Sequence, residues 1–286
     1  MALEEYVLAA VLSELTPQGT TLDSAERAFE VQAIVARTYA AANPQRHRHD
    51  QFDLCDSTHC QLVEADRPRR SSWAPIARRA VDRTAGVVLV FDGRPAQALY
   101  HADCGGHTSA ADAVWRGVPI PYLGGVEDTV PGPGHLQAWR FDVAVDRLQR
   151  ALDGDPVTRV GSRLRDVAIV ERDSTGRATQ VRIDGARSVA VTGDVFRAVV
   201  ARAFGPRALR STRFAVTRTS QEFSFEGRGF GHGVGLCQTG ALGRAARGDS
   251  ARAILAHYYP GTVATRLGET GAGPALPRLR PRRSGR

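Results

Sequence analysis

The stretch that decides the start of the fold reads Tyr6-Val7-Leu8-Ala9-Ala10-Val11-Leu12-Ser13-Glu14-Leu15. Its apolar residues recur at helical spacing, which predicts a helix over residues 6–15. Pro17 and Gly19 end that helix. A second helix is predicted over residues 24–42 and stops at Asn43-Pro44. Glu14 therefore stands at the end of the first helix, directly before the segment that closes it.

Outward from these two helices, the chain alternates between short strands and further helices. We expect helices over residues 75–83, 192–203 and 238–247, and strands over 87–91, 96–100, 167–170, 180–183, 214–217 and 222–226. Turns at Asp92-Gly93 and at residues 173–176 make two hairpins, and Thr192 is suited to cap the helix that follows it. The predicted class is α+β, with mixed helices and antiparallel hairpins forming two lobes around a cleft. One catalytic domain is expected over residues 1–268, followed by a basic, flexible tail over residues 269–286.

Composition narrows the classes of function. The chain has 286 residues, 42% of them hydrophobic, and no run of eighteen apolar residues, so we expect a sizeable core and no membrane span. The net charge is +8 and every basic side chain is arginine, a bias that is explained most simply by a GC-rich genome. Such a surface could bind nucleic acid, but it would equally favour anionic wall polymers or membrane surfaces. The arginines show neither interleaved aromatic residues nor a recognition-helix pattern, which argues against nucleic acid. Since no secretion signal precedes Met1, the compartment has to be inferred from the chemistry.

A short polar loop holds candidate metal ligands. His49, Cys55, His59 and Cys60 lie close together in the sequence, and thiolates with imidazoles suit tetrahedral zinc. His47 could replace His49, because the spacing does not fix the path of the loop. With four protein ligands the zinc would be structural. The alternative is that Cys55 and Cys60 form a disulfide or stay reduced beside solvated histidines.

Two glycine-rich stretches surround the other cysteines. Glycine alternates from Gly227 to Gly235, which suits close backbone approach, either in a structural turn or in the floor of a sugar or peptide site. The residues that would follow in a phosphate loop are absent. Cys104 and Cys237 could act as nucleophiles with His107 or His232 as base, but small buried residues are the favoured interpretation.

The position of Glu14 has two interpretations on pattern alone. A single glutamate on a helix is more often an exposed polar residue. At a helix end beside a cleft, however, a partly desolvated carboxyl group would have a raised pKa, as a general acid requires.

The combination of these motifs resembles the SpoIID/LytB family, the stage II sporulation protein D type of peptidoglycan lytic transglycosylase. The resemblance runs in the family's order from Leu3 to Thr262. The matching segments are residues 5–14, 30–40, His59-Cys60-Gln61, Cys104-Gly105-Gly106-His107-Thr108, Trp115 and residues 229–238. The chain departs from the family in three ways: Leu15-Thr16-Pro17 replaces the usual Met-Pro, Cys237 stands where many members have serine, and the family's N-terminal strands are missing.

The resemblance implies that Glu14 is the catalytic glutamate and that His49, Cys55, His59 and Cys60 form the zinc site of some members. The substrate-binding candidates are Arg37, Tyr39, Gly105, Gly106, His107, Thr108, His232 and Gln238. The implied reaction cleaves the bond between N-acetylmuramic acid and N-acetylglucosamine in glycan stripped of stem peptides, giving 1,6-anhydro ends outside the cytoplasm. Two-carboxylate hydrolysis would need a partner such as Asp103 or Asp128. The alternative function is a glycan-binding module that enhances a cell-wall amidase without chemistry of its own.

Overall fold

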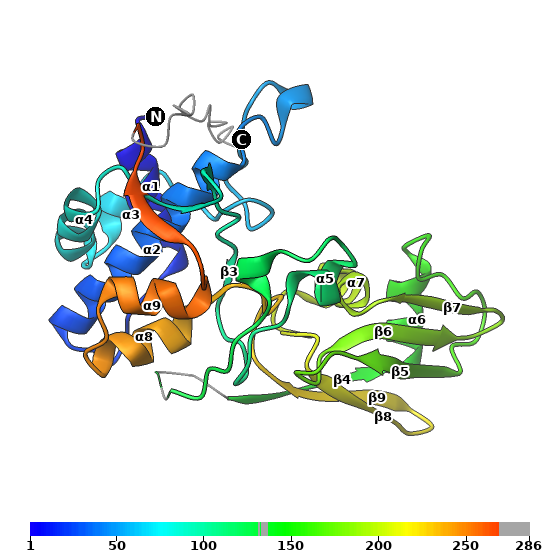
Figure 1. Ribbon diagram of the computed structural model, residues 1–286. Coiled ribbons are helices and arrows are strands. Elements are labelled where there is room, and N and C mark those ends of the chain that lie inside the picture. The colour runs from blue at the N-terminus through cyan, green and yellow to red at the C-terminus, as the bar shows by residue number, and fades with distance from the viewer. Residues whose placement is uncertain (131, 133–136, 269–286) are drawn as a thin grey trace. The chain divides into compact units, whose positions relative to one another are not determined.

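The computed structural model describes residues 1–130, 132 and 137–268 (Figure 1). The chain forms two compact units. Unit 1 consists of residues 1–100 together with the segment from residue 241 onward, and unit 2 consists of residues 101–240. The helices and antiparallel sheets confirm the α+β class. The tail expected over residues 269–286 lies outside the described residues.

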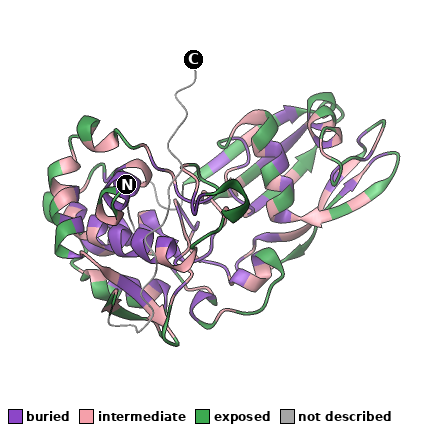
Figure 2. Cartoon of the chain, turned by 90° about the horizontal axis from the view of Figure 1, so that it is seen from above, coloured by how far each residue is buried: buried purple, intermediate pink, exposed green. Residues whose placement is uncertain are grey.

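Unit 1 is built around two helices that the sequence predicts. The helix α1 (Leu3–Glu14) is buried at every residue from Tyr6 to Leu12 (Figure 2), because apolar side chains cover its whole circumference and not one face. The helix α2 (Leu22–Ala42) is capped by Thr21, whose hydroxyl accepts a hydrogen bond from the backbone N–H of Ser24. Around them lie α3 (Arg67–Arg70), α4 (Ala74–Arg83), the short helix η1 (Arg48–Asp50), α9 (Ala251–Tyr258) and most of α8 (Gln238–Ala246).

A three-stranded sheet of unit 1 joins distant parts of the sequence. The strand β1 (Val87–Phe91) lies between β2 (Arg94–Pro95) and β11 (Val263–Arg266), in the order β11-β1-β2. The expected hairpin over residues 87–100 is therefore only partly formed, because β2 is two residues long. The longer pairing of β1 is with β11, from Val87–Arg266 to Val90–Val263.

Unit 2 contains two further antiparallel sheets. One has the order β4-β9-β8 and the other β5-β6-β7, and two-residue strands β3 and β10 pair separately. The strands are β3 (Tyr100–His101), β4 (Ala138–Ala144), β5 (Asp166–Arg172), β6 (Ala178–Asp184), β7 (Ser188–Thr192), β8 (Phe214–Arg218), β9 (Glu222–Arg228) and β10 (Leu236–Cys237). The helices are α5 (Ala111–Trp115), η2 (Pro121–Leu123), α6 (Val145–Asp153) and α7 (Gly193–Phe204).

The core of unit 2 is rich in aromatic residues. Phe196 of α7 packs against Phe214 and Phe225 of the β4-β9-β8 sheet, with ring centroids 6.2 and 5.9 Å away. The predicted hairpin of β5 and β6 is confirmed, and so is the predicted cap of α7, because the Thr192 hydroxyl accepts from the N–H of Val195. Within the part of the chain that the structure describes, none of the helices has the length and apolarity that a membrane span requires.

Candidate functional site

Glu14 is the last residue of α1, and two donors hold its carboxyl group. The backbone N–H of Leu62 donates to Oε1 at 2.6 Å, and the Tyr100 hydroxyl donates to the same oxygen at 3.0 Å. The side chain is half-buried. The helix ends there because Leu15 takes an extended conformation and Pro17 follows. The carboxyl group is thus fixed at one oxygen by partners from two other segments.

Burial raises the pKa of Glu14, and the N–H of Leu62 and the hydroxyl of Tyr100 oppose that rise without cancelling it. The carboxyl group also lies at the negative end of the α1 dipole, which disfavours its ionised form. Burial, and then the nearby Glu14, raise the pKa of Tyr100 well above its usual value, so its hydroxyl remains a donor. This combination suits a carboxylic acid that gives up a proton and later takes one back.

Two more tyrosines accompany Glu14 in unit 1. Tyr6 of α1 is fully buried and Tyr39 of α2 is 4% exposed. Burial raises the pKa of Tyr39 to about 12, and the thiol of Cys60 adds to that rise. Burial is the main cause of the raised pKa of Tyr6, and the nearby Cys60 and Glu14 raise it further. The carboxyl group and the cysteine-containing loop therefore belong to one neighbourhood.

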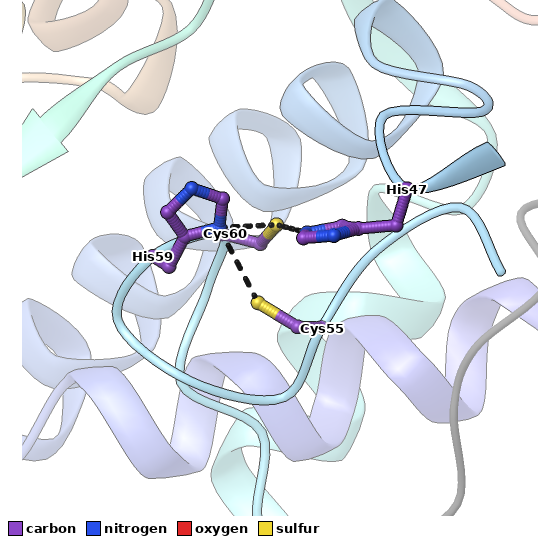
Figure 3. Close-up of side chains that lie close together, drawn as sticks. All are labelled: His47, Cys55, His59 and Cys60. Atoms are coloured by element: carbon purple, nitrogen blue, oxygen red, sulfur yellow. Dashed lines mark hydrogen bonds between the residues drawn. The ribbon is translucent and has the colours of Figure 1, made fainter. Parts of the chain in front are cut away.

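The loop that follows α2 brings four metal-binding side chains together. His47, Cys55, His59 and Cys60 place one ligand atom each within 4.8 Å of all the others (Figure 3). Nε2 of His47 is 3.3 Å from Sγ of Cys60, and Nδ1 of His59 is 3.7 Å from both sulfurs. Tetrahedral zinc with these ligands requires separations of roughly 3.5–3.8 Å between ligand atoms. The three closest contacts are near that range, so the four residues, which we call the loop group, are candidate ligands for such an ion.

The structure corrects the choice of histidine in this group. Of the two histidines that the sequence left open, His47 and not the preferred His49 joins the two cysteines and His59. The reason is local: His49 lies inside η1, and its Nε2 is 3.4 Å from Nε of the neighbouring Arg48. His47 precedes that turn and stacks on Phe52 with ring centroids 4.6 Å apart, which directs its imidazole toward Cys60.

The loop group is connected directly to Glu14. Leu62, whose N–H reaches the carboxyl group, follows Cys60 by two residues. The N–H of Glu64 donates to the hydroxyl of Ser13 at 3.0 Å, and the Gln61 side chain donates to the carbonyl of Ala36 in α2 at 3.1 Å. The loop thereby holds the last two residues of α1, Ser13 and Glu14.

Three of the expected substrate-binding side chains are too buried for that role. Arg37 is 0% exposed, and its guanidinium donates to both oxygens of Glu4, at 3.0 and 2.6 Å, so that it joins α2 to α1. Thr108 is 1% exposed and is bonded to the backbone of Val126. The ring of Tyr39 is buried beside Cys60. These side chains build the fold and do not face solvent.

In unit 2 the two glycine-rich stretches pack against each other. The backbone of Asp103 pairs with that of Phe230, with N–H to carbonyl distances of 3.0 and 2.7 Å. A side chain on Gly229 would meet the carbonyl of Asp103 at 2.9 Å, and Gly105 lies against the backbone of Arg228. Gly105 and the alternating glycines at positions 227, 229, 231 and 233 therefore allow close packing, which agrees with the structural-turn interpretation of their pattern.

The remaining binding candidates differ in accessibility. His107 and His232 are half-buried, whereas Gln238, at the start of α8, is 7% exposed. Nδ1 of His107 is 2.7 Å from the carbonyl of Thr108. His232 lies 5.2 Å from the ring of Trp115, which is 43% exposed. Trp115 is thus an accessible aromatic residue beside the binding candidate His232, and the sequence interpretation did not assign Trp115 to binding.

Burial also argues against two alternatives from the sequence, a cysteine nucleophile and a second carboxylate for hydrolysis. Cys104 and Cys237 are 0% exposed, so neither sulfur can attack a peptide substrate in this conformation. Asp103 and Asp128 are 6% and 0% exposed, and an oxygen of Asp103 accepts the N–H of Gly105. Neither carboxylate is presented to a substrate, as a second group for hydrolysis would have to be.

Comparison with known proteins matches one family model to part of each unit. The model of the family described as stage II sporulation protein, SpoIID, matches residues 1–91, and a domain of unknown function, DUF8618, matches residues 135–235. An uncharacterized protein of Brachyspira hyodysenteriae is 30% identical over 91% of this chain and 65% of its own length. The amidase enhancer of Bacillus subtilis is 26% identical over 83% of this chain and 38% of its own length.

A third relative, stage II sporulation protein D of Bacillus amyloliquefaciens, is 28% identical over 91% of this chain and 73% of its own length. The chain spans less than two thirds of the length of the Brachyspira protein and of the amidase enhancer. The residues around Glu14 lie within or next to the segment matched by the SpoIID model. On these matches, the chain belongs to the SpoIID family.

Proposed function

We propose that this protein is a peptidoglycan lytic transglycosylase and that Glu14 is its catalytic residue. The observation that carries the proposal is the setting of Glu14: a half-buried carboxyl group with a raised pKa, held at one oxygen by Leu62 and Tyr100. The resemblance of the motifs to cell-wall proteins supports the choice of substrate.

The proposed reaction uses one carboxyl group twice. Protonated Glu14 gives its proton to the oxygen that bridges N-acetylmuramic acid and N-acetylglucosamine, and the bond from that oxygen to C1 breaks. The Glu14 carboxylate then takes the proton of the muramyl 6-hydroxyl while O6 bonds to C1. The product is a 1,6-anhydro sugar, so neither water nor a second carboxylate takes part. The donors at Oε1 stabilise the carboxylate formed between the two steps.

Glycan stripped of stem peptides is the proposed substrate, and the proposed location is outside the cytoplasm, where that glycan occurs. The product therefore tests the function. Mass spectrometry of denuded glycan after incubation with the protein is expected to show 1,6-anhydromuramyl ends. Reducing muramyl ends would indicate hydrolysis and contradict the proposal. Unchanged glycan would instead favour a binding module, a role suggested by the similarity to a protein named amidase enhancer.

Zinc is the proposed occupant of the loop group, with His47, Cys55, His59 and Cys60 as its ligands. Bound zinc would cross-link the loop and would take no part in the reaction. Its proposed effect is on position: the loop between Cys60 and Glu64 carries the N–H groups that hold Glu14 and Ser13.

Replacing Tyr100 tests how Glu14 is tuned. Tyr100→Phe removes a donor that opposes the rise in the pKa of Glu14, so that pKa goes up further. The acid form then persists to higher pH, and the alkaline limb of the kcat/KM profile is expected to move to higher pH. The maximum kcat is expected to fall about 10–100-fold, since a hydrogen bond to a charged group contributes about 1.5–3 kcal/mol.

Tyr6→Phe is the matched control for this prediction. Tyr6 belongs to the same buried cluster, yet within the described part of the chain its hydroxyl has no hydrogen-bond partner. Its loss is expected to leave the pH profile in place. A Tyr100→Phe profile that coincides with the wild-type profile would remove Tyr100 from the mechanism.

A further inference from the structure

A second cluster of metal-binding side chains lies in unit 2, apart from the loop group. His101, Cys104 and Cys237 place one ligand atom each within 4.8 Å of the other two, and we call them the inner group. They come from β3, the loop after it and β10. His101 is 4% exposed and the two cysteines are 0% exposed. The proposed glycan reaction assigns no task to any of the three.

Backbone N–H groups point at both sulfurs of the inner group. The N–H of Gly106 donates to Sγ of Cys104 at 3.2 Å. The N–H groups of Cys104 and Gly240 donate to Sγ of Cys237 at 3.2 and 3.3 Å. A neutral thiol is a weak acceptor, whereas a thiolate gains from such donors, which are a feature of metal-bound cysteine. Cysteines that only fill space in a core do not require them.

The histidine of the inner group is oriented as metal ligands usually are. Nδ1 of His101 is 3.2 Å from the carbonyl oxygen of Val234. A carbonyl can only accept, so Nδ1 carries the proton and the lone pair of the neutral ring is on Nε2. Histidines that bind metal through one nitrogen commonly donate the other N–H to a backbone carbonyl in this way.

Charges near the inner group balance with a divalent ion in place. Two thiolates neutralise one divalent cation. The buried guanidinium of Arg177, 1% exposed, donates to the carbonyl of Cys104 at 2.6 Å. The thiol of Cys104 donates to an oxygen of the Asp128 carboxyl group, 0% exposed, at 3.5 Å, and a bound metal ion would take the place of that thiol proton. Arg177 and Asp128 thus supply one positive and one negative charge, which cancel.

We propose that His101, Cys104 and Cys237 bind a second metal ion of the zinc class, through Nε2 and two thiolates, in the interior of unit 2. Soft sulfur donors with an imidazole select zinc over magnesium or calcium, which prefer oxygen ligands. The two sulfurs are fully buried, so the ion would lie in the interior of the unit and not at its surface. The ion would join the glycine-rich loop after β3 to β10, whose backbones already approach each other closely.

The metal content of the full chain tests this proposal. Purified protein, dialysed against a weak chelator, is expected to hold one more zinc ion per chain than the Cys104→Ala/Cys237→Ala variant. The decisive protein is Cys55→Ala/Cys60→Ala, which removes the loop group and leaves unit 2 unchanged. It is expected to retain one zinc ion, and after exchange into cobalt to show the sulfur-to-cobalt absorption of thiolate ligands.

Two results would overturn the proposal. The first is a folded Cys55→Ala/Cys60→Ala variant that holds no metal. The second is a wild-type chain in which alkylation under denaturing, non-reducing conditions modifies only two of the four cysteines, with Cys104 and Cys237 joined as a disulfide. Where a double variant fails to fold by circular dichroism, the metal count of the wild-type chain still decides, because the loop group alone accounts for a single ion.

Discussion

Glu14→Gln is expected to lower kcat on denuded glycan by about 10²–10⁴-fold, the range that a general acid or base contributes. The amide cannot give a proton to the bridging oxygen, yet its own oxygen can still accept from Leu62 and Tyr100, so the surroundings stay in place. Formation of anhydro ends, followed by mass spectrometry, is the measurement. Glu5→Gln is the control, because Glu5 belongs to the same helix but is exposed and pairs with Arg78 at 2.6 Å.

The same variant is expected to be more stable than the wild-type protein at neutral pH. Because burial raises the pKa of Glu14, the native state binds its proton more tightly than the unfolded state does. That contribution to stability is fully present below the unfolded pKa of glutamate and is lost as the pH rises through the higher native value. The thermal midpoints of the two proteins should therefore coincide in acid and separate toward neutral pH. A variant that is both active and no more stable would contradict the assignment of Glu14.

The second large effect is expected from the loop group. His47→Ala should weaken zinc binding by at least about 100-fold. Losing only a residue that hydrogen-bonds to a metal ligand already lowers metal affinity by about 10–100-fold, and His47 is itself a proposed ligand. At a fixed zinc concentration, a 100-fold loss corresponds to about 2.7 kcal/mol, or a fall in the thermal midpoint of about 5–10 °C. Activity should fall about 10–100-fold, since the N–H of Leu62 would no longer be held against Glu14.

His49→Ala provides a control of the same residue type two positions away. Its ring is outside the loop group, so zinc content, thermal midpoint and activity are expected to stay at wild-type values. If His49→Ala loses the metal and His47→Ala keeps it, the ligand set drawn from the structure is wrong.

Local patterns in the sequence predicted the elements that depend on neighbouring residues. The helices α1, α2 and α7 and the hairpin of β5 and β6 follow from apolar spacing, a capping threonine and a turn. The partner of β1 could not be predicted in this way, because β11 lies far along the chain and its short polar-apolar pattern is weak. Strand pairing over such distances depends on the assembled fold and not on local periodicity.

The same limit applies to the site. The position of Glu14 at a helix end could be predicted, but its donors are 48 and 86 residues away in sequence, and no local signal marks Leu62 or Tyr100. For Arg37, the family resemblance suggested substrate binding, whereas its ion pair with Glu4 is visible only once α1 and α2 are packed. The choice of His47 over His49 depended on a single short turn.

The pairing of β1 with β11 has a consequence for biosynthesis. The sheet that packs on α2 is completed by residues 263–266, which leave the ribosome after the whole of unit 2. The nascent chain must therefore carry an unfinished first unit, with one edge of β1 unpaired, while the inserted unit is translated. Contacts of such long sequence separation slow folding and leave apolar surface open to chaperones. The sheet of unit 1 would then be complete only after residues 263–266 have been synthesised.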